Sequence, residues 1–448
     1  MRTYSWQTGT NVNPLKTSFL GRFTLLEETG GISDDMLREL DRRVSEYSLA
    51  VPEDMRERFV SKNELMASFA ISKAEKTNKL TLDEMKQIRV GMRKTGGKLV
   101  DAEGRPDDIM ALKPKRAHDR VEYGNILRTY QWSLKEGNIT AGNLSIDLIQ
   151  RVHKGLTEGL DVFEDKIMEF DPYRPGILRV NDDIRVNKYK PVDAKEIINE
   201  LTELIGFYRG NPSLANLGLF HAGLYAIHPF NNGNKRLCRI LEHALLRDLG
   251  LNRANLYNHS YYYYKNANRY YGALLKGLMA ENFTPIVKVT REAVFFSQLD
   301  VFRNSVEQQR DDFIRERVGS LITNDNQAKV YSHMVKSKAV WYNKIVDKTK
   351  KVAERTVKDY LKQGLERGVL KKRDVGKRSY YSLNFDTWEE EMVRDYVSQR
   401  AGHIASIPDR FLASIYRPDE FWKTAGKAMD GDEAPGEPEE TETRGISP

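Results

Sequence analysis

The residues best suited to chemistry lie together in one short stretch, from His228 to Arg239. An apolar run ends at His228, and a polar loop that contains Gly233 follows before a second helical pattern begins near Asn234. The first N–H groups of a helix have no partner within the helix, so a loop that ends there is a ready anion site. His228 is the side chain of this loop that can exchange a proton near neutral pH. The stretch therefore predicts a base beside an anion site.

Two arginines follow on the second predicted helix. Arg236 and Arg239 are three residues apart and therefore share a helix face above the loop. Each guanidinium offers several directed donors to anionic oxygens, so the pair suits a polyphosphate. The residues alone leave one alternative open, which is a structural histidine followed by an arginine pair on a solvated face.

The same stretch resembles the signature of the Fic (Fido) family, His-x-Phe-x-(Asp/Glu)-Gly-Asn-Gly-Arg-x-x-Arg. The matching residues are His228, Phe230, Gly233, Asn234, Arg236 and Arg239. Family members typically move AMP from ATP, with Mg²⁺, onto a hydroxyl side chain of a target protein. The resemblance implies that His228 is the catalytic base and that Phe230 anchors the loop. It also implies an ATP phosphate site made by Gly233, Asn234, Lys235, Arg236 and Arg239.

Two positions differ from the family pattern. Asn232 replaces the acidic residue that holds Mg²⁺, and an amide offers one neutral oxygen without the charge that makes such a site strong. Lys235 replaces the second glycine and adds a bulky point charge. The Doc branch of the family also has Asn-Lys-Arg at these positions, and it resembles a kinase-like member that moves a phosphate instead of AMP. That branch usually lacks the last arginine, which this chain keeps as Arg239. Three alternatives to AMP transfer stay open: a phosphotransferase favoured by Lys235, an inactive nucleotide sensor favoured by Asn232, and a DNA-binding regulator whose Fic domain only docks partners.

An earlier segment resembles the inhibitory helix of some Fic proteins, which carries (Ser/Thr)-x-x-x-Glu. The glutamate of that helix pairs with the last arginine of the signature and blocks the ATP γ-phosphate. Ser68 matches the first position, whereas Ser72 occupies the position of the glutamate. The alternative is that both serines lie on an ordinary exposed helix.

Two further segments are assigned through the resemblance. Short apolar runs on each side of 181–183 predict a β-hairpin, which in the family is the flap that clamps the target beside the histidine. The implied flap residues are Arg179, Val180, Ile184 and Arg185. A tyrosine-rich segment resembles the helix that walls the adenine pocket, which implies roles for Asn266 and Tyr270; a core tyrosine stripe is the alternative.

Residues 326–384 predict three helices and then a two-stranded hairpin, an order that resembles a winged helix-turn-helix. Cations crowd the third helix and the hairpin, as expected for phosphate contacts with the helix in a major groove of double-stranded DNA. The expected DNA-binding residues are Arg355, Lys358, Lys362, Lys377 and Arg378. A winged helix that docks proteins is the alternative.

The whole chain has 448 residues and a net charge of +7, and its composition is that of a soluble globular protein. Without an apolar run near twenty residues or a secretory signal, and with one cysteine, it is expected in the cytoplasm with no membrane partner. A protein substrate is the expected partner, and a homodimer is left open. The predicted class is mainly α: a helical Fic fold with a small β-hairpin flap, followed by a winged-helix domain. The predicted domains are 1–60 (N-terminal extension), 61–295 (Fic domain with its N-terminal helices), 296–325 (linker helix), 326–384 (winged helix), 385–428 (C-terminal helices) and 429–448 (disordered acidic tail).

Overall fold

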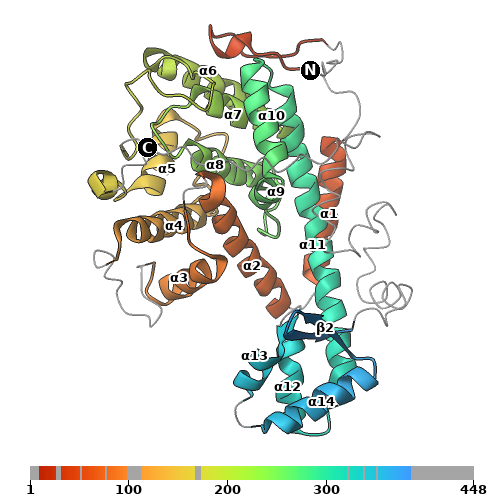
Figure 1. Cartoon of the computed structure of the whole chain (residues 1–448). Coiled ribbons are helices and arrows are strands. Elements are labelled where there is room, and N and C mark those ends of the chain that lie inside the picture. The colour runs from red at the N-terminus through yellow and green to blue at the C-terminus, as the bar shows by residue number, and fades with distance from the viewer. Residues whose placement is uncertain are drawn as a thin grey trace. The chain divides into compact units, whose positions relative to one another are not determined.

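The structure, a computed structural model, describes most of the chain up to residue 384 and is predominantly helical (Figure 1). The mainly α class is confirmed, since the sheet in the described part is a small antiparallel one of three strands. Two compact units meet in the chain at Leu299 and Asp300, and they are called the N-terminal and C-terminal units below. The expected C-terminal helices and acidic tail lie outside the described residues. The described ranges are 10–26, 32–50, 53–75, 78–97, 112–166, 173–319, 322–335, 339–349 and 352–384.

The N-terminal unit is built from helices whose ends carry clear sequence signals. Ser145 and Ser213 cap α5 and α7 by accepting a backbone N–H, and Thr81 with Glu84 forms a capping box at the start of α3. The helices are α1 (Asp34–Ala50), α2 (Glu53–Ser72), α3 (Leu82–Lys94), α4 (Pro114–Ser133), α5 (Ile146–Thr157), α6 (Ile197–Gly210), α7 (Leu214–Ile227), α8 (Asn234–Asp248), α9 (His259–Lys265), α10 (Ala267–Met279) and α11 (Thr284–Gly319), the last of which continues past Leu299. Short 3₁₀ helices are formed by Leu20–Arg22, Lys73–Glu75, Asp161–Lys166 and Ala194–Glu196.

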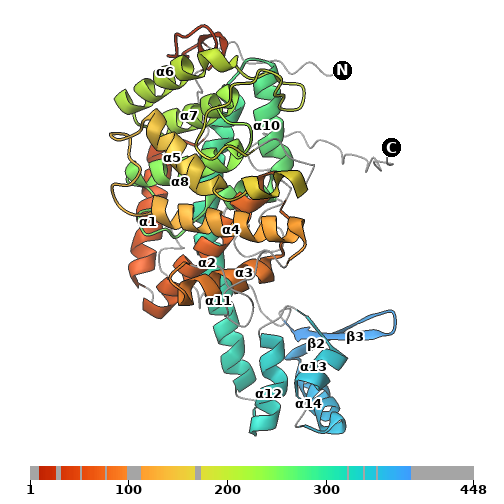
Figure 2. The ribbon, with the colours of Figure 1, turned by 90° about the vertical axis from the view of Figure 1, so that its left-hand side faces the viewer.

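The centre of this unit is the pair α7 and α8, which pack on each other (Figure 2). Every residue of α7 from Leu217 to Ile227 is buried, which is the pattern of a helix surrounded by others. α6 covers α7, and α2, α4 and α5 pack on α8. The link between α7 and α8 is the loop 228–233, so the candidate site lies between two rigid core helices.

The segment from Tyr173 to Asp193 does not form the regular β-hairpin expected around 181–183, and this detail of the prediction is wrong. It contains one isolated antiparallel bridge, between Val186 and Tyr189, and no strand. Its polar groups bond to neighbouring parts of the chain instead of forming a ladder. The Arg179 N–H donates to the carbonyl of Pro229 at 2.9 Å, for example.

The C-terminal unit contains a small mixed fold with its own apolar core. Its elements are α12 (Asp325–Val335), β1 (Val340–Trp341), α13 (Tyr342–Lys348), α14 (Glu354–Glu366), β2 (Leu370–Val375) and β3 (Arg378–Leu383). The strands are antiparallel in the order β1-β3-β2, and the core includes Val330, Ile345, Val357, Leu361 and Leu370. The expected three helices and hairpin are therefore present. The assignment of this unit to the winged helix-turn-helix class stays a prediction.

Candidate active site

His228 ends α7 in a left-handed backbone conformation, with φ 51° and ψ 62°. This conformation costs a non-glycine residue of the order of 1–2 kcal/mol, so the surroundings must hold it. Arg179 does so, because its Nε donates to the His228 carbonyl at 2.8 Å. The imidazole lies edge-on to the Tyr225 ring, with the ring centres 5.6 Å apart. The turn places His228 between the end of the core helix α7 and the loop that follows it.

Arg179 is a buried support of the loop and not an exposed flap residue. Its side chain is almost fully buried, and its guanidinium also donates to the carbonyls of Val192 and Ile227. The bonds to Ile227 and His228 satisfy carbonyls at the end of α7 that have no helical partner. Among the other expected flap residues, Val180 and Arg185 are exposed, whereas Ile184 is buried.

The loop is closed by its own side chains. Asn234 accepts the N–H of Phe230 at 3.1 Å and donates to the Phe230 carbonyl at 2.8 Å. Phe230 is fully buried and stacks on the His153 ring at 3.7 Å, as expected of a loop anchor. Because the side-chain amide of Asn234 bonds within the loop, an anion would bind to the backbone N–H of Asn234 and not to its side chain.

His153 is the site residue that sequence reasoning missed. Its Nδ1 accepts the N–H of Gly176 at 3.0 Å, so the proton is on Nε2, which donates to the Asn232 carbonyl at 3.1 Å. Burial lowers the pKa of His153 to about 3, so this neutral tautomer persists at physiological pH. The available signal was a histidine on the apolar face of α5, beside Ile149 and Leu156.

Gly233 meets the same histidine. Its φ is +75°, and an added Cβ would lie 3.2 Å from His153 Nε2 and 3.3 Å from Thr157 Cγ2. The backbone conformation and the close approach both require glycine here. Gly233 is the N-cap of α8, so its backbone lies at the helix N-terminus, where negative charge is favoured.

Arg236 is tied to a carboxylate. Its Nη1 lies 2.5 Å from Glu122 Oε1, and Glu122 Oε2 accepts the Asn78 amide at 2.8 Å. Both partners of the ion pair are almost fully buried, and the pair joins α8 to α4. An expected phosphate ligand thus has a structural bond on one of its nitrogens.

Arg239, in contrast, has no carboxylate partner among the described ion pairs. It is 1% exposed, and its Nη1 donates to the Ala70 carbonyl near the end of α2 at 2.9 Å. The rings of Tyr263 and Tyr270 lie 5.4 and 5.1 Å from the guanidinium carbon. Nε has no hydrogen bond within the described part of the chain. A buried cation with an unused donor is a strong site for an anion.

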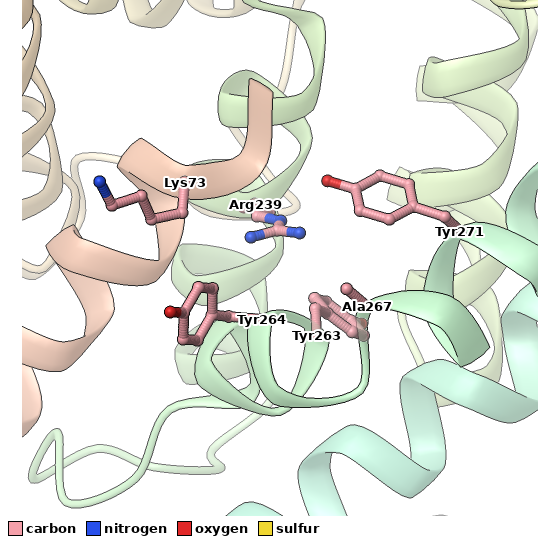
Figure 3. Close-up of a pocket in the computed structure, with 6 residues that line it drawn as sticks. All are labelled: Lys73, Arg239, Tyr263, Tyr264, Ala267 and Tyr271. Atoms are coloured by element: carbon pink, nitrogen blue, oxygen red, sulfur yellow. The ribbon is translucent and has the colours of Figure 1, made fainter. Parts of the chain in front are cut away.

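Arg239 borders a pocket of about 240 Å³ (Figure 3). The other lining residues are Lys73, Tyr263, Tyr264, Ala267 and Tyr271. The Lys73 ammonium is turned away from Arg239 in Figure 3 and donates to the carbonyls of Asn78 and Leu80, so the stem of Lys73 lines the pocket. The Lys235 ammonium lies 5.5 Å from the Tyr271 ring, which connects the loop to this pocket.

Tyr270 lies behind that pocket, in a buried polar network. Its hydroxyl bonds to His221 Nε2 at 2.9 Å, and His221 Nδ1 bonds to Glu242 at 2.8 Å. Burial opposes ionisation of Glu242, but His221, His259 and the Tyr263 hydroxyl outweigh it and lower the pKa of Glu242 to about 2. Tyr270 therefore supports the pocket wall from within the core.

Asn266 lies at the junction of α9 and α10. Its amide donates to the Tyr262 carbonyl at 3.2 Å. Its expected contact with adenine stays a prediction.

Ser68 and Ser72 are both fully buried, so the alternative, an ordinary exposed helix, is wrong. Ser68 bonds to the Tyr123 hydroxyl at 3.1 Å, and the Ser72 hydroxyl donates to the Phe69 carbonyl at 2.7 Å. No described hydrogen bond joins either serine to Arg239. The partner of that arginine on α2 is a backbone carbonyl instead.

Comparisons with known proteins identify one family. Residues 143–246 match the model of the Fic/DOC family, and no curated protein matches the chain. A Fic family protein from Desulfovibrio desulfuricans G20 is 16% identical, with a TM-score of 0.44, over 81% of this chain and 100% of its own. Fic-1 from C. elegans is 17% identical, with a TM-score of 0.42, over 60% of this chain and 71% of its own. A Fic domain containing signaling protein from Bacteroides thetaiotaomicron is 15% identical, with a TM-score of 0.41, over 60% of this chain and 98% of its own.

The family match spans the loop and the two helices that it joins, from the start of α5 to most of α8. It includes the loop 228–233, the base candidate His228 and the arginine Arg239. Within the described residues, no helix has the length and apolar character needed to cross a membrane. On the family match, residues 143–246 of this chain are assigned to a Fic/DOC family domain.

Proposed function

We propose that the Fic/DOC domain transfers AMP from ATP to a Ser, Thr or Tyr hydroxyl of a protein. Membership of the family supports a Fic-type transferase at the family level. The observation that carries the proposal is the joint placement of three groups. A left-handed turn sets His228 at the start of the loop, Gly233 opens the N-terminus of α8, and Arg239 borders a pocket with an unused donor.

In this reaction His228 takes the proton of the target hydroxyl, and the oxygen attacks the α-phosphorus of ATP. The bond to the β-phosphate oxygen breaks, and pyrophosphate leaves with the electron pair. The backbone N–H groups of Gly233, Asn234 and Lys235 bind the phosphates, where the helix start favours negative charge. Arg239 supplies donors to the charge that develops on the phosphates. The tyrosine-lined pocket beside it has room for part of the nucleotide.

Mg²⁺ fits this site weakly. No group of three or more acidic, histidine or cysteine side chains suited to a metal occurs in the described part of the chain. The loop offers the Asn232 amide as its protein ligand, and ATP phosphates would provide the other oxygens. When bound, the ion supplies positive charge to the phosphates.

Two observations keep rival functions open. Lys235 adds an ammonium beside the loop, within 5.5 Å of the Tyr271 ring, which favours transfer of a phosphate. Asn232 removes the charged metal ligand, which favours a nucleotide-binding regulator without turnover. A regulator that docks partners through this domain is the third rival.

The test is to incubate the full chain with a lysate of its source cells and ATP labelled either on the α- or on the γ-phosphate. AMP transfer gives protein labelled from α-labelled ATP only. Phosphate transfer gives protein labelled from γ-labelled ATP only. Protein that stays unlabelled in both reactions, together with ATP binding measured by calorimetry, refutes transfer and supports the regulator. His228→Ala is the control, because its loss of label assigns the signal to this site.

A further inference from the structure

A second pocket, of about 240 Å³, lies within the C-terminal unit. Its walls come from α12, β1, α13 and β3, and they include Trp341, Tyr380, Lys344, Lys348 and His333. The volume is below the roughly 300–1,000 Å³ of pockets that enclose a whole drug-sized ligand. The pocket therefore fits a single ring with its substituent. None of the residues described as lining it is acidic.

Two of the lining rings belong to a row across the sheet. Trp341 pairs with Tyr380 between β1 and β3, and Tyr380 pairs with Arg373 between β3 and β2. Paired residues project from the same face of a sheet. The next pair, Val340 and Tyr381, is buried in the core, so the row projects from the opposite face. Trp341 and Tyr380 are only partly buried, which leaves ring surface accessible beside the pocket.

The paired residues Trp341, Tyr380 and Arg373 are called the aromatic row below, after its two rings. Further cations lie near it. Lys344 and Lys348 are four residues apart on α13, are exposed, and form no described ion pair. The Arg378 guanidinium lies 5.0 Å from the centre of the Trp341 ring. The row thus combines ring faces with nearby donors for phosphate.

On α14, the helix expected to enter a DNA major groove, basic residues are balanced by acidic ones. α14 carries three basic and three acidic residues, and two of its lysines are close to glutamates: Lys358 is 3.6 Å from Glu354 and Lys362 is 3.7 Å from Glu366. The hairpin Leu370–Leu383 carries five basic residues and one acidic residue. Positive charge therefore collects beside the aromatic row and not along α14.

We propose that this surface of the C-terminal unit binds single-stranded nucleic acid. One base stacks on Trp341 and Tyr380 in the pocket, and the adjoining phosphates meet Lys344, Lys348 and the cations of the hairpin. Stacking on aromatic side chains contributes about 1–3 kcal/mol per base and tolerates any base, because every base has a ring face. A duplex keeps its ring faces stacked inside, so it cannot use the pocket without losing a base pair. This function is independent of the transfer proposed for the Fic/DOC domain.

The experiment measures binding of the full chain to a fluorescent thymidine 20-mer and to a duplex of the same length, across a salt titration. We expect the single strand to bind more tightly. Trp341→Ala should weaken it about 5–150-fold, the equivalent of the stacking energy of one base. In the parent, the bound strand should quench the fluorescence of Trp341. Trp341→Phe should retain most of the affinity but lose this quenching.

Two double variants with the same charge change separate the pocket from α14. Lys344→Ala with Lys348→Ala should weaken the single strand and reduce the magnitude of its salt slope by about 1.4, since each phosphate contact on a single strand contributes about 0.7. Lys358→Ala with Lys362→Ala should leave both quantities nearly unchanged. All four lysines are exposed, so both variants should fold as the parent does.

Three results would overturn the proposal. The first is a duplex that binds as tightly as the strand. The second is an α14 variant that loses as much affinity as the α13 variant, which would make α14 the contact with DNA. The third is thymidine monophosphate binding as tightly as the 20-mer, because the pocket would then serve a free nucleotide.

Discussion

The clearest quantitative prediction concerns Gly233→Ala. The added Cβ faces two penalties: a left-handed backbone at φ +75°, and contacts of 3.2 and 3.3 Å with His153 and Thr157. The backbone penalty for a residue other than glycine is about 1–2 kcal/mol. Forcing an extra methyl group into packed surroundings adds about 1–3 kcal/mol. Together they should lower the free energy of unfolding by about 2–5 kcal/mol.

Gly159→Ala is the matched control. Gly159 has nearly the same backbone angle, φ +72°, but no atom lies within 4 Å of an added Cβ. It should therefore lose only the backbone part, about 1–2 kcal/mol. Urea unfolding of both variants gives the comparison, read from the midpoints at unchanged slope. Equal losses would refute the reasoning, because the contact with His153 would then contribute nothing to the requirement for glycine.

Three further predictions concern the site. His228→Ala should abolish transfer and leave ATP affinity within a few-fold, because the phosphates bind to backbone and arginine; transfer at the parent rate would remove His228 from the mechanism. Asn232→Asp should raise turnover by about tenfold or more, the equivalent of about 1.4 kcal/mol, and lower the Mg²⁺ concentration required. Coincident Mg²⁺ titrations of the two proteins would mean that Asn232 does not face the metal. The third concerns pH: the pKa of His153 falls from 6.5 to about 3 on folding, so its stabilising contribution is complete above pH 6.5 and is lost as the pH falls toward 3. His153→Gln should therefore show a smaller loss of unfolding free energy over that range than the parent, and an equal loss would contradict the lowered pKa of His153.

Much of the fold could be predicted because its signals are local. The caps Ser145 and Ser213 lie next to apolar helical patterns, and the Gly233 loop interrupts such a pattern between two helices. The order of elements in the C-terminal unit also followed from periodicity and from the turn at Gly376. These features depend on neighbours within a few residues, which is the range that a sequence pattern reports.

The supports of the site could not be predicted in this way. Arg179 contacts a carbonyl 49 positions away, and His153 contacts one 79 positions away. Nothing near either residue in the sequence marks these bonds. The expected hairpin failed for the same reason, since the backbone of Arg179 pairs with Pro229 and not with its own segment. The ion pair of Arg236 with Glu122 also joins residues far apart in the sequence, and it gives a predicted phosphate ligand a structural contact.

The hydrogen bond from Arg239 to the Ala70 carbonyl has a consequence for natural variation. Its acceptor belongs to the main chain, so exchanging the residue at position 70 leaves the acceptor in place. A survey of variants would therefore find position 70 limited only by the space around its side chain, while position 239 would tolerate little change. Methods that infer contacts from paired substitutions would therefore miss this hydrogen bond between α2 and α8, because only one of the two bonded groups belongs to a side chain.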